Sequence, residues 1–107
     1  MTLKIDSAVI EIMEPDAELD PNTICRACNL SSEVLVEWVE AGVVEPRVSA
    51  RNEWRFSVGQ LRRARAARRL QRDLELQTTS LPVVLDLLEE LHQLRRRLAT
   101  LERLVED

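Results

Sequence analysis

The sequence predicts a mainly α-helical protein, and three observations support this prediction. Its 107 residues include only two glycines, four prolines and 3% aromatic residues, whereas a β-sandwich of this size needs more turn-forming and aromatic side chains. Hydrophobic residues make up 45% and charged residues 32%, which is typical of one folded, well-solvated domain. Near the C-terminus, apolar residues recur alternately every three and four positions, which is the period of a helix.

The N-terminal segment is expected to be extended. Residues 3–12 alternate loosely between apolar and polar side chains, which predicts a β-strand. The Glu14-Pro15-Asp16 segment then ends this strand, because it contains strong turn formers. We expect the strand to pair with a hairpin that comes later in the chain.

Two short helices are expected after this strand. Asp20 is a typical N-cap residue and Pro21 fits the first helical position, so the first helix begins here and continues to Cys28. A turn at residues 29–30 leads into the second helix. Two short helices joined by a tight turn make a helix-turn-helix.

The second helix has clear end signals and one apolar face. Ser31 is expected to cap its start, with Ser32 as the alternative, and Gly42 is suited to the left-handed residue that follows a helix. The residues of the apolar face recur at helical spacing and are Val34, Leu35, Trp38 and Val39.

A small β-hairpin, or wing, is expected next, followed by a third helix. Residues 43–47 and 52–56 are short candidate strands around a turn. Ser57 is the expected cap of a helix over residues 58–76, with a polar break after it. The sequence therefore predicts a winged helix-turn-helix domain with an N-terminal strand over residues 1–76.

The last helix is expected to open at Leu81-Pro82 and to form a dimerisation helix over residues 81–107. A second apolar strip near its start, at Leu81, Leu85 and Leu88, is expected to pack on the preceding domain. The main apolar seam follows a heptad pattern and needs a partner helix, in a parallel or antiparallel homodimer, or in an intramolecular bundle. Its residues are Val84, Leu87, Leu91, Leu94, Leu98, Leu101 and Val105.

Charge is divided unevenly along the chain. Residues 1–45 carry ten acidic and two basic side chains, whereas residues 46–107 carry nine acidic and thirteen basic side chains. Glu33, Glu37 and Glu40 share one face of the second helix, which in a DNA-binding protein would enter the major groove. Because these carboxylates would repel phosphates, the face is better suited to a basic protein partner. The expected partner-binding residues are Glu33, Val36, Glu37, Glu40, Val44 and Glu45.

The alternative is a DNA-binding regulator. The central arginines surround the third helix, whose buried side is expected to be apolar, and some are expected to pair with the acidic first half of the chain. Arginine also holds phosphates well, so nucleic-acid binding stays open as a less favoured alternative. The arginines that would contact phosphates are Arg47, Arg51, Arg55, Arg62 and Arg63.

Candidate catalytic and metal-binding residues are few. Cys25 and Cys28 have the spacing of a zinc or redox motif, but a structural zinc needs four ligands and His92 is the only histidine. We therefore expect both thiols to serve in packing, and we expect no metal, no cofactor and no enzymatic activity. The absence of an export signal or a long apolar run predicts a cytoplasmic protein.

Three segments and the arginine-rich helix together resemble the CbpM family of bacterial chaperone modulators, which have a MerR-like N-terminal domain. The resemblance extends over residues 22–105. It implies a homodimer that binds the J-domain of a CbpA-like DnaJ homologue and prevents that J-domain from stimulating the DnaK ATPase. A J-domain presents a basic helix to DnaK, which an acidic face would complement. The three segments are Asn-Leu-Ser-Ser-Glu-Val-Leu at 29–35, Gly-Val-Val-Glu-Pro at 42–46 and Trp-Arg-Phe at 54–56.

Overall fold

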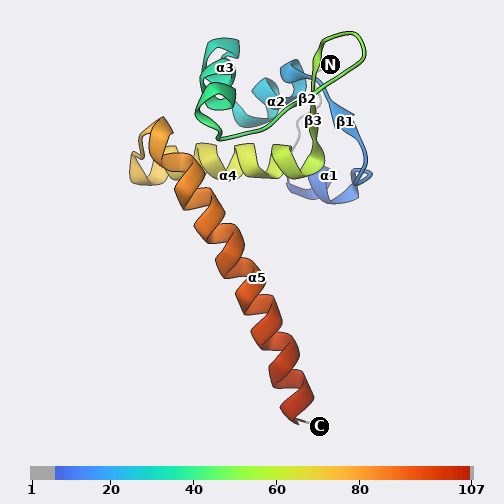
Figure 1. Cartoon of the computed structure of the whole chain (residues 1–107), viewed down its shortest axis with the longest axis vertical. Helices are drawn as coiled ribbons and strands as arrows, with labels where there is room; N and C mark the ends of the chain where they lie inside the picture. Colours follow the sequence, from blue (N-terminus) through green and yellow to red (C-terminus); the bar gives the residue numbers. More distant parts are fainter. Residues whose placement is uncertain (1–6, 107) are drawn as a thin grey trace.

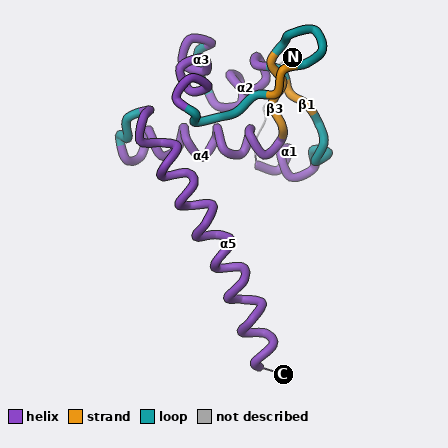
Figure 2. Tube along the Cα trace, viewed as in Figure 1, coloured by secondary structure: helices purple, strands orange, loops and turns teal. Residues whose placement is uncertain are grey.

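The computed structural model describes residues 7–106 and is mainly helical, as predicted (Figure 1). Helix α4 lies beneath α2, α3 and the small sheet, and α5 projects away from this body, which we define as residues 7–74. Strands are confined to short segments on one side of the body (Figure 2). In chain order the elements are α1 (Ser7–Ile12), β1 (Glu18–Leu19), α2 (Pro21–Cys28), α3 (Ser32–Ala41), β2 (Arg47–Val48), β3 (Trp54–Ser57), α4 (Val58–Leu74), the 3₁₀ helix η1 (Thr78–Ser80) and α5 (Leu81–Glu106).

The helices of the helix-turn-helix begin and end where the sequence predicts. The Thr23 amide donates a hydrogen bond of 2.8 Å to Asp20 Oδ1, and the Thr23 hydroxyl donates a second one to the same oxygen. Together these two hydrogen bonds hold the pKa of Asp20 below its usual value. Ser31, and not Ser32, caps α3 by accepting from the Val34 amide at 3.2 Å. Gly42 has a φ of 80°, a left-handed conformation that glycine adopts without steric strain.

The expected N-terminal strand is wrong over residues 7–12, which form α1, and residues 3–6 lie outside the described residues. Val9, Ile10 and Met13 are spaced as on one face of a helix, and Ile10 is 4% exposed in the core. A short apolar segment fits both the strand and the helix period, so its pattern alone does not decide between them.

A strand of only two residues takes the place that was expected for the N-terminal strand. The sheet order is β1-β3-β2, with both pairings antiparallel. Leu19 pairs with Phe56, and Val48 pairs with Trp54. The predicted hairpin is therefore confirmed, but its first strand lies at Arg47–Val48 instead of residues 43–47, and β1 extends the hairpin to three strands.

The core lies between α4 and the elements above it. Trp38 of α3, Phe56 of β3 and Leu61 of α4 are all at most 1% exposed, and Trp54 meets Phe56 edge to face at 6.3 Å between ring centroids. These aromatic side chains hold the wing against the body. Ser57 caps α4 as predicted, and α4 ends at Leu74, two residues before the predicted end.

Helix α5 is held to the body only near its start. Leu81 and Leu85 are 0% and 3% exposed, as predicted for the second apolar strip, and Leu88 is half-buried. From residue 89 onward every described residue of α5 is exposed, so most of the helix has no cover within the chain. Its 26 residues correspond to about 39 Å at 1.5 Å per residue.

Candidate protein-binding site

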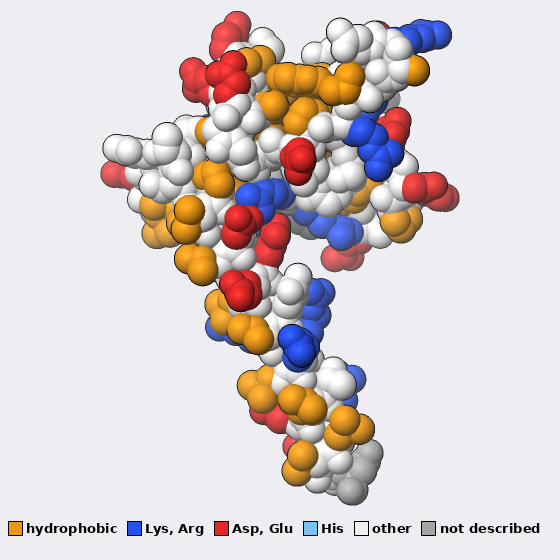
Figure 3. Space-filling model, in the orientation of Figure 1, with side chains coloured by type: hydrophobic (Ala, Val, Ile, Leu, Met, Phe, Trp, Pro, Cys, Tyr) orange, Lys and Arg blue, Asp and Glu red, His pale blue; other side chains and the backbone are white. Residues whose placement is uncertain are grey.

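The outer face of α3 presents unpaired carboxylates. Leu35 and Trp38 anchor the inner face of this helix, which turns Glu33, Glu37 and Glu40 outward. No basic side chain within residues 7–106 forms an ion pair with any of these three glutamates. Figure 3 shows acidic side chains gathered over the end of the body where α3 lies. This acidic α3 face, defined by the three glutamates, is accessible and keeps its charge unneutralised.

The apolar residues predicted for this site have different positions. Val36 is 42% exposed and lies at the edge of this face, beside the glutamates. Val44 is 2% exposed and belongs to the core, so the prediction that it contacts a partner is wrong. The residue follows Gly42, where the chain turns inward and buries Val43 and Val44 together. Two adjacent valines do not by themselves indicate that both will be buried.

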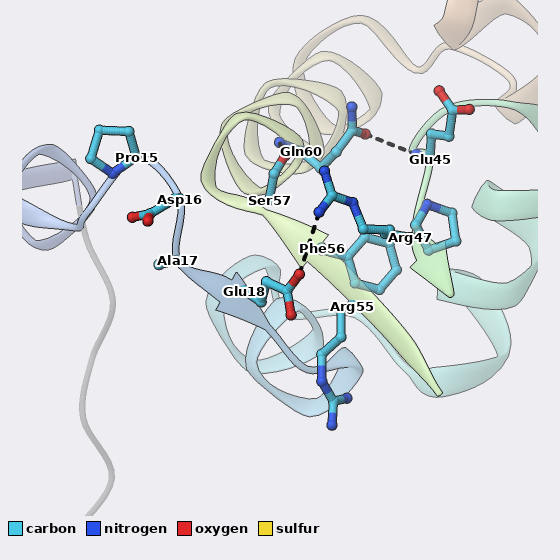
Figure 4. A pocket seen from close by; sticks show the side chains of 11 residues that line it. Pro15, Asp16, Ala17, Glu18, Glu45, Arg47, Arg55, Phe56, Ser57 and Gln60 are labelled. Atoms are coloured by element: carbon cyan, nitrogen blue, oxygen red, sulfur yellow. Dashed lines mark hydrogen bonds and ion pairs between the residues drawn. The ribbon is translucent and has the colours of Figure 1, made fainter. Parts of the chain in front are cut away.

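Glu45 borders a groove on the sheet side of the body. Its amide donates a hydrogen bond of 2.8 Å to Gln60 Oε1, and its side chain is exposed. Figure 4 shows the groove, of about 400 Å³, between the β1 segment, the base of the hairpin and the start of α4. Arg47 and Glu18 form an ion pair of 3.6 Å there, and because both are exposed the pair stabilises little. The lining residues are Pro15, Asp16, Ala17, Glu18, Glu45, Pro46, Arg47, Arg55, Phe56, Ser57 and Gln60.

The seam of α5 forms a continuous apolar stripe on an exposed helix. Val84 is half-buried, whereas the other six seam residues are between 39% and 84% exposed. Val83 and Leu104 add exposed apolar surface beside the seam. A stripe of this length on a solvated helix is typical of an interaction surface, because covering apolar area stabilises by about 25 cal/mol per Å².

The arginines considered for phosphate contacts are partly occupied within the chain. Arg55 contacts Glu53 at 2.7 Å and the Trp54 carbonyl at 2.9 Å, and Arg47 pairs with Glu18 as described above. Arg51 and Arg62 are exposed. The prediction that some arginines pair with the acidic first half of the chain is therefore confirmed for Arg47.

Arg63 has a structural role that the sequence did not indicate. Its Nε donates to the Val43 carbonyl at 2.6 Å, and its Nη1 lies 3.0 Å from carboxylates of both Asp86 and Glu89. Its side chain is 12% exposed. Arg63 thus joins the end of α3, α4 and α5, and its guanidinium is not free to hold a phosphate.

The two cysteines lie in the amphipathic α2. Cys28 is buried in the core, and burial raises its pKa to about 11, while burial also raises the pKa of Cys25. Among residues 7–106 no group of three or more possible ligands could hold a metal ion. Packing accounts for Cys28, as expected.

No described helix is both long enough and apolar enough to cross a membrane. Helix α5 has sufficient length, but it carries charged side chains from Asp86 to Glu106.

Two capped helices, a β-hairpin with its supporting helix and a protruding C-terminal helix together define a winged helix-turn-helix protein. Residues 19–103 match the sequence model of the MerR HTH family regulatory proteins. The chain is 35% identical over 103 residues to the chaperone modulatory protein CbpM of Coxiella burnetii, covering 96% of this chain and 95% of that protein.

Similar matches come from two pseudomonads. The CbpM proteins of Pseudomonas putida and Pseudomonas entomophila are 37% and 36% identical over 78 residues, covering 73% of this chain and 77% of each relative. The chain therefore belongs to the CbpM family, within the MerR-like helix-turn-helix proteins.

Proposed function

We propose that this protein is a non-enzymatic chaperone modulator that binds the J-domain of a CbpA-type DnaJ homologue and prevents that domain from stimulating DnaK. The relatives are named chaperone modulatory proteins, which supports the general role. The observation that carries the proposal is the acidic α3 face, because the helix that reads DNA in other helix-turn-helix proteins carries three unpaired carboxylates here. This role places the protein in the cytoplasm.

The chemistry of this face suits a basic helix of the partner. Three carboxylates along about two turns attract and orient a cationic surface, and Val36 supplies an exposed apolar contact beside them. Glu45 adds a carboxylate at the groove between β1, the hairpin and the start of α4. We therefore retain Glu33, Val36, Glu37, Glu40 and Glu45 as the partner-binding residues.

We further propose that the seam of α5 holds two copies together. In this proposal the domain of residues 1–76 binds the partner and the helix of residues 81–107 forms the dimer. A second copy covers the exposed seam leucines with an identical stripe, which is the simplest way to bury a helix that has no cover within its own chain. Each dimer then carries two acidic α3 faces.

Substitution Glu37→Arg tests the proposal at the centre of the acidic α3 face. We expect binding of a purified J-domain, measured by isothermal titration calorimetry, to weaken at least tenfold, because a like charge replaces an attractive one. The J-domain-stimulated ATPase of DnaK should then be inhibited less by the variant than by the wild type.

The matched control is Glu14→Arg, which makes the same charge change at an exposed residue outside this face. The control should bind the J-domain as the wild type does, and both variants should keep the helical circular dichroism spectrum. Equal affinity of Glu37→Arg and wild type would remove the face from the proposal.

The alternative, a regulator that reads DNA with its helix-turn-helix, has less support. Glu33, Glu37 and Glu40 would face the phosphates, and Arg63 is already bound within the chain. A regulator that reads DNA bases should prefer particular DNA sequences in a gel shift at about 100 mM salt. The proposed function predicts no such sequence preference.

A further inference from the structure

Helix α4 carries arginines that the proposed function does not use. At about 100° per residue, five of them fall within an arc of about 120° on one side of the helix, whereas Arg63 lies apart and contacts α5. The expectation that the arginines surround the helix is thus replaced by a one-sided arrangement. We name this set the α4 arginine strip, and its members are Arg62, Arg65, Arg68, Arg69 and Arg72.

Two hollows follow this strip, and they share Arg65 and Arg69. The first, of about 260 Å³, opens between α1 and α4 and is lined by Ile10, Glu11, Arg62, Arg65, Ala66 and Arg69. The second, of about 320 Å³, opens between the end of α2 and α4 and is lined by Ala27, Cys28, Asn29, Arg65, Arg68, Arg69 and Arg72. Glu11 is the only acidic residue in either lining, so both hollows are strongly positive.

Most of this charge is unpaired within the described chain. Among residues 7–106, Arg72 alone of the strip forms an ion pair, at 3.2 Å with its exposed neighbour Asp73. The Nη1 atom of Arg65 is buried and has no hydrogen-bond partner there. A buried charged donor without an acceptor is costly, but an enclosed atom offers no surface to a ligand. The guanidinium groups available for contact are therefore those of the exposed Arg62, Arg69 and Arg72.

The surroundings of the strip indicate the kind of ligand. None of the exposed large apolar side chains of the described residues lines either hollow. Protein interfaces usually contain apolar or aromatic anchors at their centre, whereas the backbone of a nucleic acid is bound mainly by charge. Arginine also matches phosphate oxygens with two parallel donors.

We infer that the α4 arginine strip binds the phosphate backbone of nucleic acid without reading its base sequence. From Arg62 to Arg72 the helix rises about 15 Å, which is the rise of about four nucleotides of one strand at 3.4 Å each. This surface lies on α4, separate from the acidic α3 face proposed for the J-domain. The inference therefore stands or fails independently of the proposed function.

The test is fluorescence anisotropy with two labelled DNA duplexes of unrelated sequence, at 50 and 200 mM salt. We expect equal affinity for both duplexes. Affinity should fall about a hundredfold from 50 to 200 mM salt, because binding by the strip releases about four counterions from the DNA. Arg65→Gln/Arg69→Gln should weaken binding at least tenfold. Arg62→Gln/Arg72→Gln changes two exposed arginines and should do the same, even if the first pair alters folding.

The matched control is Arg96→Gln/Arg103→Gln, which removes two exposed arginines from α5 and should leave DNA binding unchanged. Inorganic polyphosphate should displace the duplex, whereas poly-glutamate of equal charge should not. The inference is overturned by absent binding at 50 mM salt, by strip variants that bind as tightly as the control, or by displacement with poly-glutamate, which would identify a surface for acidic proteins. J-domain binding by the strip variants should match that of the wild type, which separates this result from the proposed function.

Discussion

Replacing Arg63 with methionine should destabilise the fold by an amount that the structure allows us to work out. Methionine keeps much of the aliphatic stem, so the change mainly removes the guanidinium that joins the end of α3 to α5. The substitution also leaves the Val43 carbonyl without its donor beside a fully buried side chain.

The expected loss is about 2–4 kcal/mol in the free energy of unfolding. A hydrogen bond from a charged donor contributes about 1.5–3 kcal/mol. Asp86 and Glu89 are mostly exposed, so solvent screening limits each ion pair to about 1 kcal/mol or less. The bond to Val43 therefore dominates the total.

Urea denaturation followed by circular dichroism at 222 nm measures this difference, at one fixed protein concentration because a dimer's stability depends on concentration. The control is Arg62→Met, at an exposed neighbour, which should change the free energy of unfolding by less than about 0.5 kcal/mol. If Arg63→Met is as mild as this control, the bridge between α3, α4 and α5 contributes nothing to stability.

Two further predictions concern α5 and the thiols. Leu94→Lys should convert the proposed dimer to a monomer in analytical ultracentrifugation, because the substitution puts a charge at the centre of the seam. The body of the variant should remain folded. An unchanged mass would place the dimer contact elsewhere. Cys28 should react with iodoacetamide more slowly than Cys25, because a pKa of about 11 leaves about one thiolate in a thousand at pH 8, and its rate should rise about tenfold per pH unit up to pH 10. Equal labelling of both cysteines at pH 8 in peptide mass spectrometry would contradict the buried position of Cys28.

The parts of the fold that were predicted correctly depend on local chemistry. An N-cap such as Asp20 or Ser31 acts on an amide three residues away, and Gly42 satisfies its own backbone requirement. The seam of α5 was equally clear, because its period is repeated over several turns. Signals of this kind do not depend on the rest of the structure.

The parts that were missed depend on contacts between distant segments. β1 has two residues and exists only because Leu19 meets Phe56, which lies 37 positions further along the chain. The burial of Val44 and the engagement of Arg63 depend on how α4 crosses its neighbours, which no local pattern records. The two hollows along the α4 arginine strip likewise exist only because α1 and the end of α2 pack beside α4.

The positions of the two indole rings give the protein a pair of intrinsic optical reporters. The chain has no tyrosine, so its near-ultraviolet fluorescence comes from Trp38 and Trp54. Trp38 is completely enclosed and its emission follows the integrity of the interior, whereas Trp54 sits partly exposed on the hairpin, where its emission follows the solvent around the wing. Retaining one ring at a time, by a Phe replacement of the other, therefore separates unfolding from events at the surface without any added dye.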